Sequence, residues 1–219
     1  MTRSDDRYSL ERIRECLELK NFDSDGAQQK MTPRPRGLRP PERAGRPRQG
    51  GVLLVLYKKE GVTFLVLTRR RDDLNSHAGQ VSFPGGRREG EESLESTALR
   101  EAHEEIGLDL NQLQVIGRLS CLYIPPTDYE VYPFVSWYDG PQQFTAQDSE
   151  VAEILEVPLE HLLDPKNQHE EPWEVRGIQV QVPYYLVASH KVWGATAMML
   201  SEFLERIKAS GQGTGDSEQ

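Results

Sequence analysis

The residues best placed for chemistry are three glutamates in one short segment: Glu101, Glu104 and Glu105. Apolar residues at helical spacing precede and accompany them, and a glycine follows, so we predict a helix over 93–106 that Gly107 ends. Spacings of three and four residues make the three carboxylates neighbours on that helix. Adjacent like charges cost a bare helix roughly 0.3 kcal/mol each, and a hard divalent cation such as Mg²⁺ offsets that repulsion.

A solvated acidic face that pairs with Arg100 is the alternative interpretation, and three glutamates alone favour it because short motifs often arise by chance. The surroundings reverse this preference. The pair Gly85-Gly86, just before the segment, lets the backbone pass close to a ligand or bend sharply. The whole segment reads Gly86-x5-Glu92-x7-Arg100-Glu101-Ala102-His103-Glu104-Glu105-Ile106-Gly107-Leu108.

This pattern resembles the signature of the Nudix hydrolases, Gly-x5-Glu-x7-Arg-Glu-U-x-Glu-Glu-x-Gly-U, in which U is a bulky aliphatic residue. Every fixed position matches, and the one departure is the small Ala102 at a U position on the packing side of the helix. The resemblance implies an α/β fold, a Nudix-type α/β/α sandwich with a mixed β-sheet. It also implies hydrolysis of a diphosphate that links a nucleoside to a second group.

The resemblance further assigns roles to single residues. Mg²⁺ or Mn²⁺ would be held by three carboxylates and a backbone carbonyl, namely Glu101, Glu104, Glu105 and Gly85. Arg100 would orient a glutamate, and Glu92 would hold the loop or reach the metal. Enzymes of this kind often take an additional acid or general base from a loop, and we select Glu150 from the acidic loop that also contains Asp148 and Glu153. The catalytic set is therefore Arg100, Glu104, Glu105 and Glu150.

Residues 67–86 resemble an additional motif of the coenzyme A pyrophosphatase subgroup, Leu-Leu-Thr-x-Arg-Ser-x-x-Leu-Arg-x-His-x-Gly-Gln-Val-x-Phe-Pro-Gly-Gly. The matching positions are Thr68, Arg70, Leu74, His77, Gly79, Gln80, Val81, Phe83, Pro84, Gly85 and Gly86. Arg71 stands where the motif has Ser, and Asn75 where it has Arg. The resemblance implies substrate contacts from Arg69, Arg70, His77 and Gln80.

The subgroup motif predicts hydrolysis of coenzyme A or its thioesters to 4′-phosphopantetheine, or its acyl form, and adenosine 3′,5′-bisphosphate. A Nudix diphosphatase acting on ADP-ribose, NADH or dinucleoside polyphosphates is the nearest alternative. A nucleotide-binding module without catalysis is another alternative, because a protein can keep a fold after it has lost the catalytic activity. A third is RNA-end processing aided by the basic stretch 30–49, which holds seven basic residues, one acid and five prolines.

The elements that must position these residues follow from the pattern of apolar residues. Residues 51–57 and 62–68 predict a hairpin, the first strand of which is buried on both faces. Further strands are predicted over 81–83, 114–122, 131–137, 153–157, 173–176 and 178–187, and further helices over 9–19 and 192–208. We therefore expect a helix and a Pro/Arg-rich strap or linker over 1–49, a Nudix domain over 50–208 and a disordered tail over 209–219.

Composition limits the partners and the compartment. The chain has 219 residues and a net charge of −9, which makes nucleic-acid binding an unfavoured interpretation. No apolar run reaches the roughly 20 residues that a membrane helix needs, and the polar first residues do not resemble a secretory signal. Two isolated cysteines indicate a reducing, cytoplasmic environment. A small nucleotide is the expected partner, and the resemblance leaves a homodimer open.

Overall fold

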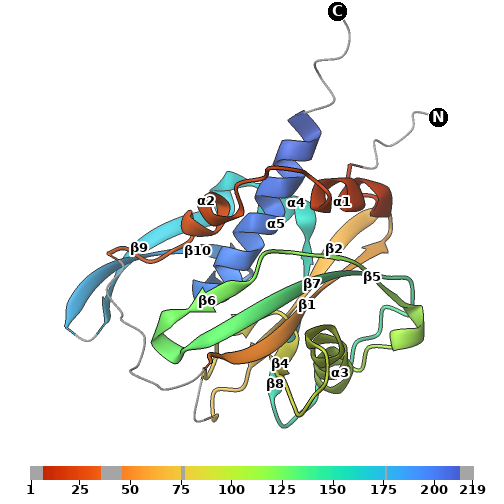
Figure 1. Cartoon of the computed structure of the whole chain (residues 1–219), viewed down its shortest axis with the longest axis horizontal. Coiled ribbons are helices and arrows are strands. Elements are labelled where there is room, and N and C mark those ends of the chain that lie inside the picture. The colour runs from red at the N-terminus through yellow and green to blue at the C-terminus, as the bar shows by residue number, and fades with distance from the viewer. Residues whose placement is uncertain (1–6, 36–45, 75–76, 176, 213–219) are drawn as a thin grey trace, which may run out of the picture.

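A mixed sheet of eight strands forms the centre of the computed structural model, which describes residues 7–35, 46–74, 77–175 and 177–212 (Figure 1). Strand β1 (Arg48–Lys59) pairs antiparallel with β2 (Val62–Arg70) and parallel with β7 (Tyr129–Tyr138). The remaining strands of this sheet are β3 (Val81–Ser82), β4 (Gly85–Arg87), β5 (Leu113–Arg118), β6 (Leu122–Ile124) and β8 (Val151–Pro158). The predicted hairpin and the predicted mixed sheet are confirmed.

Helices cover both faces of this sheet, as Figure 1 shows for α3 (Leu94–Ile106) and α5 (Gly194–Gln212). Successive side chains of a strand point to opposite faces, so the apolar run of β1 serves two cores. Leu53 packs in the core that contains α3, whereas Leu54 packs in the core that contains α5. Both side chains are fully buried. The α/β/α sandwich therefore follows from a strand that is apolar on both faces.

A second, antiparallel sheet contains β9 (Gln168–Val175), β10 (Ile178–Val187) and β11 (His190–Trp193), and the short helix α4 (Leu159–Leu163) precedes it. The closing helix was predicted over 192–208, but it begins at Gly194 because β11 occupies the preceding residues. It also continues to Gln212, so residues 209–212 are helical and the predicted boundary of the tail was wrong there. Residues 213–219 lie outside the described residues.

The N-terminal segment packs on the sandwich. The helix predicted over 9–19 is α1 (Leu10–Leu17), and Ser9 is its N-cap. Helix α2 (Ser24–Gln29) was not predicted, because it is only six residues long and has little apolar periodicity. After it, Lys30 pairs with Glu205, and the backbone of Arg34 exchanges two hydrogen bonds of 2.9 and 2.7 Å with Gln181 of β10. Part of the predicted basic strap, 36–45, lies outside the described residues.

Within the described part of the chain, no helix is both long and apolar enough to cross a membrane. Cys16 is buried and Cys121 is exposed, and both are free thiols. The other differences from prediction concern β9, which begins at Gln168 rather than at residue 173, and several short segments. The strand predicted over 114–122 is divided into β5 and β6, and the brief elements α4, β4 and β11 were not predicted.

A buried ion pair within α5 belongs to a polar network that joins this helix to the N-terminal segment. The fully buried carboxylate of Glu202 accepts hydrogen bonds from Arg206 Nε at 3.1 Å, Gln28 Nε2 at 2.8 Å and the Ser120 N–H at 3.2 Å. Three donors compensate for the loss of water around the carboxylate. This cluster connects α2, α5 and the segment between β5 and β6.

Replacing Arg206 with Met should lower the free energy of unfolding by about 3 kcal/mol, because it leaves a buried carboxylate without its counter-charge. Urea unfolding of the intact chain would measure the loss. Lys208→Met is the matched control, since it removes a partly exposed pair with Glu205 and should cost less than about 1 kcal/mol. Equal losses in the two variants would contradict this account.

Candidate active site

The acidic helix α3 lies unusually close to β1 and β4 because glycines face it. A Cβ added to Gly51 would lie 2.2 Å from the carbonyl oxygen of Leu94 on α3. A Cβ added to Gly86 would lie 2.3 Å from the carboxylate carbon of Glu101. Both distances are far below van der Waals contact. The glycines thus allow the carboxylate of Glu101 to rest directly on the backbone of β4.

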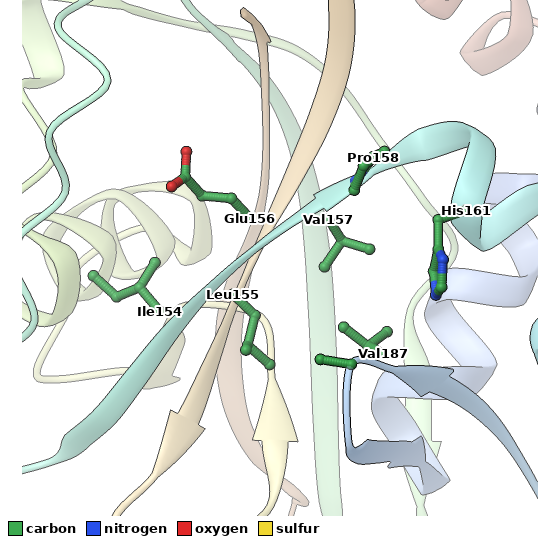
Figure 2. Close-up of a pocket in the computed structure, with 8 residues that line it drawn as sticks. Ile154, Leu155, Glu156, Val157, Pro158, His161 and Val187 are labelled. Atoms are coloured by element: carbon green, nitrogen blue, oxygen red, sulfur yellow. The ribbon is translucent and has the colours of Figure 1, made fainter.

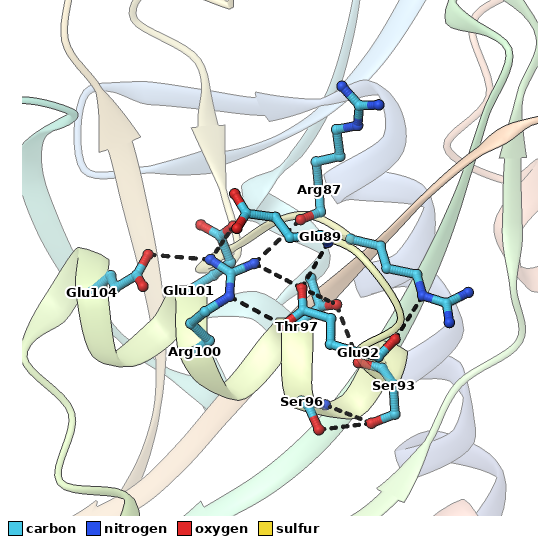
Figure 3. Close-up of polar contacts among 10 residues, drawn as sticks. Arg87, Glu89, Glu92, Ser93, Ser96, Thr97, Arg100, Glu101 and Glu104 are labelled. Atoms are coloured by element: carbon cyan, nitrogen blue, oxygen red, sulfur yellow. Dashed lines mark hydrogen bonds and ion pairs between the residues drawn. The ribbon is translucent and has the colours of Figure 1, made fainter.

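Arg100 is the centre of a polar network on the exposed side of α3 (Figure 3). Its Nη1 donates to Glu101 Oε1 at 3.0 Å and to Glu104 Oε2 at 3.2 Å. Its Nη2 and Nε donate to the two oxygens of Glu92 at 2.9 and 3.2 Å. Arg100 thus contacts three glutamates, and its hydrogen bonds to Glu92, together with the interaction with Glu101, raise its pKa.

Glu92 closes the loop that leads into α3. Besides Arg100, it accepts hydrogen bonds from the Glu89 N–H at 2.9 Å and from the Thr97 hydroxyl at 3.0 Å. Ser93 caps the helix by accepting from the Ser96 N–H at 3.0 Å. The hydrogen bonds from Arg100, followed by the backbone bond from Glu89, lower the pKa of Glu92 to about 2. Glu92 therefore holds the loop, which is one of the two roles that the resemblance implied.

Glu105 points into the protein and is 5% exposed. Its carboxylate accepts a hydrogen bond from the Gly85 N–H at 3.2 Å. Burial raises the pKa of Glu105 to about 7, and the negative charges of Glu101 and Glu150 act in the same direction, while the Gly85 bond and Arg70 oppose it. Burial also raises the pKa of Glu101. A buried and a partly buried carboxylate therefore lie where a positive charge would stabilise them.

The predicted metal ligands lie on α3 and at the start of β4. Over the described ranges, no three side chains of His, Cys, Asp or Glu are arranged as a set of metal ligands. Glu101 and Glu104 nevertheless converge on a single nitrogen of Arg100, and Glu105 is buried nearby. Carboxylate and carbonyl oxygens are the hard ligands that Mg²⁺ and Mn²⁺ prefer. The chemistry of Glu101, Glu104, Glu105 and the Gly85 carbonyl thus fits such an ion.

The four predicted substrate-binding residues lie at the end of β2 and in the loop that follows. Arg70 N–H donates to the Gln80 carbonyl at 2.9 Å, and His77 Nδ1 and Gln80 Oε1 are 2.8 Å apart. The Arg70 guanidinium pairs with Glu150 at 3.5 Å, while Arg69 pairs with Asp72. Asn75, where the motif departs, lies outside the described residues.

Glu150 lies beside the acidic helix. Its charge acts on the pKa values of both Glu101 and Glu105, and its carboxylate pairs with Arg70. Glu153, the alternative acid in this segment, is instead 3.0 Å from His190 Nε2. The structure therefore brings Arg70 and Glu150 to the acidic helix and directs Arg69 towards Asp72.

Comparison with known proteins agrees with this geometry. A family model described as the NUDIX domain matches residues 47–176. The chain belongs to the Nudix family. Over 171 residues it is 37% identical to an uncharacterized Nudix hydrolase, NudL, of Photorhabdus laumondii, which covers 77% of this chain and 90% of that relative. A NudL of Yersinia pestis is 35% identical over 161 residues, covering 73% and 80% of the two chains.

Solved structures show the same fold for this Nudix hydrolase. A Caenorhabditis elegans Ap4A hydrolase in a binary complex matches with a TM-score of 0.50 and 15% identity, covering 76% of this chain and 98% of the other. A MutT protein from Methanosarcina mazei matches with a TM-score of 0.50 and 19% identity, covering 78% and 99%. Because the identities are below 20%, this similarity establishes only the fold of the chain.

Two surface cavities lie near the Nudix sheet. One of about 370 Å³ is lined by β8 together with His161, Val187 and Ala188, and Figure 2 shows that its wall is mainly apolar. It includes none of the predicted site residues. The other, of about 410 Å³, is lined by Arg71, Asp148 and their neighbours. Only the second cavity adjoins the loop that carries Glu150.

Replacing Glu92 with Gln should reduce the dependence of stability on acid pH. The folded pKa of Glu92 lies below the unfolded value of about 4.3, so its ionised form stabilises the Nudix fold above that pH. This contribution is lost as the pH falls towards 2. Urea unfolding between pH 7 and pH 3 should show a shallower decline for Glu92→Gln than for the wild type. Glu95→Gln, an exposed position on the same helix, is the control, and an unchanged decline in Glu92→Gln would refute the prediction.

Proposed function

We propose that this Nudix hydrolase cleaves the diphosphate of coenzyme A or its thioesters. The products would be 4′-phosphopantetheine, or its acyl form, and adenosine 3′,5′-bisphosphate. The observation that carries the proposal is the position of Arg70, which belongs to the segment that resembles the coenzyme A pyrophosphatase motif. This arginine lies between that loop and the carboxylates of Glu105 and Glu150.

Arg70 also has a free hydrogen-bonding position. Among the described residues, its Nε is the one buried side-chain nitrogen or oxygen without a hydrogen-bond partner. A buried donor left unpaired costs about 1–3 kcal/mol, and an anionic ligand oxygen would recover this energy. Guanidinium groups bind phosphate oxygens with charge-assisted hydrogen bonds. Arg70 thus supplies a phosphate contact at the edge of the acidic cluster.

The other residues take roles in keeping with their surroundings. A bound Mg²⁺ or Mn²⁺, held by Glu101, Glu104, Glu105 and the Gly85 carbonyl, would neutralise phosphoryl charge and favour ionisation of a water. Arg100 fixes Glu101 and Glu104, and Glu92 fixes Arg100. Glu150 or Glu105 accepts the proton of the water that attacks phosphorus. His77 and Gln80, which contact one another, shape the loop against the substrate.

Incubation with coenzyme A, ADP-ribose and NADH in one tube, with Mg²⁺ or Mn²⁺, tests the substrate. We expect adenosine 3′,5′-bisphosphate and 4′-phosphopantetheine to appear first by mass spectrometry. AMP from ADP-ribose or NADH with coenzyme A intact would support a Nudix diphosphatase of another specificity. Survival of all three substrates would favour a binding module without catalysis.

Replacing Glu104 or Glu105 with Gln should reduce metal-dependent turnover by roughly 100-fold or more, because each removes a negative charge from the cluster that faces the phosphates. Folding should persist, since burial opposes the ionised form of Glu105. Thermal unfolding would check the fold and initial rates the activity. Glu95→Gln on the same helix is the control and should retain wild-type turnover. Undiminished turnover in both Glu104→Gln and Glu105→Gln would contradict the assignment of these residues as metal ligands.

A further inference from the structure

We propose that Arg87, Arg48 and Tyr129 form a second anion subsite, which binds the monoester phosphate that the substrate carries on its nucleoside. This inference rests on the proposed function and deepens it. The subsite lies beside Gly86, on the face of the sheet opposite the face that packs against α3. It would distinguish a nucleoside with a free phosphate monoester from one that carries only the diphosphate.

Strand pairing brings the three residues together. Arg87 of β4 is opposite Gly50 of β1, and Arg48 of β1 is opposite Tyr129 of β7. Residues 48 and 50 are two apart on one strand, so they face the same side of the sheet. Three adjacent strands therefore present Arg87, Arg48 and Tyr129 on one face at one end of the sheet.

A missing side chain makes room for the cluster. A Cβ added to Gly50 would lie 2.6 Å from the Tyr129 hydroxyl and 2.4 Å from the carbonyl oxygen of Gly86. The Tyr129 phenol thus occupies the space above Gly50, and its hydroxyl reaches the loop that begins the Nudix signature. The guanidinium carbon of Arg48 is 5.5 Å from the centre of the same ring, which is cation–π distance.

Gly86 connects this cluster with the acidic helix. The Glu101 carboxylate lies against Gly86, while the carbonyl oxygen of Gly86 and the Tyr129 hydroxyl both lie over Gly50. The electrostatic surroundings agree: burial raises the pKa of Tyr129, the charges of Arg48 and Arg87 lower it, and that of Glu101 raises it. A ligand whose diphosphate lies over Glu101 therefore has Tyr129 and the two arginines within its neighbourhood.

The charges of this cluster are not neutralised by carboxylates. Figure 3 shows the Arg87 side chain directed away from the Arg100 network, and its guanidinium has no hydrogen bond or ion pair with any residue that the structure describes. Arg48 donates to the Thr127 carbonyl at 2.8 Å, which leaves its charge unpaired. Two guanidinium groups on this face therefore have no carboxylate partner among the described residues. A doubly charged phosphate monoester matches them, because guanidinium groups bind phosphate with paired donors.

The proposed subsite and Arg70 lie at different places on the sheet. The subsite is formed by β4, β1 and β7, whereas Arg70 is at the end of β2. A substrate with two separate phosphate groups can use both positions, one for the diphosphate and one for the monoester. ADP-ribose and NADH carry no phosphate monoester, so they would gain nothing from Arg87. The subsite therefore makes a prediction about specificity as well as affinity.

The test compares coenzyme A with dephospho-coenzyme A, which lacks the 3′-phosphate. Arg87→Ala should lower kcat/KM for coenzyme A by roughly 10-fold or more and leave that for dephospho-coenzyme A within about twofold, because only the monoester contact is lost. Tyr129→Phe, which keeps the ring and removes the hydroxyl, should change the same ratio in the same direction. Arg118→Ala, an exposed arginine at the end of β5, is the matched control and should change neither value.

Equal effects of Arg87→Ala on both substrates, or none on either, would overturn the subsite. A binding measurement keeps this outcome separate from failure of the proposed function. By calorimetry, wild-type protein should bind adenosine 3′,5′-bisphosphate more tightly than AMP, and Arg87→Ala should remove the difference. Failure of the wild type to hydrolyse coenzyme A would refute the proposed function alone, whereas equal binding of the two nucleotides by the wild type would refute the subsite alone.

Discussion

The candidate site depends on the close approach of α3 to the backbone of β1 and β4. Glycines at 51 and 86 permit it, since any side chain there would overlap the Leu94 carbonyl or the Glu101 carboxylate. The same approach puts the Gly85 N–H within hydrogen-bonding distance of Glu105. An acidic helix on a bare surface would be only a charged face. Because this helix packs directly against Gly51 and Gly86, its carboxylates are partly removed from water.

Placing carboxylates there creates an electrostatic cost, and the surrounding charges reduce it. Arg100 compensates Glu101 and Glu104 on the exposed side and is itself fixed by Glu92. Burial is the main cause of the raised pKa of Glu105, and the charge of Arg70 opposes it only in part. A site of this kind favours a divalent cation and disfavours a bare anion. The arginines at its two edges, Arg70 and Arg87, are where anionic groups of a substrate would meet positive charge.

The outer parts of the chain hold the sandwich without entering the acidic site. Helix α5 fills the face of the sheet opposite α3, and the buried Glu202 network attaches α2 to it. The backbone of Arg34 forms hydrogen bonds with Gln181 of β10, and so extends the β9–β10 hairpin by one further chain segment. These contacts join segments more than 100 residues apart, so the N-terminal segment is part of the folded unit in its described residues.

The acidic helix with its Gly107 end, the β1–β2 hairpin and the mixed sandwich could be predicted before folding was considered, because periodicity and helix-ending signals are local properties. The same spacing placed Glu101, Glu104 and Glu105 together. Short elements such as α2 and β11 escaped prediction because packing, rather than their own periodicity, stabilises them. The contact of Arg70 with Glu150 and the position of Tyr129 over Gly50 arise only in the folded chain. Those contacts depend on strand order and register, which no local pattern in the chain encodes.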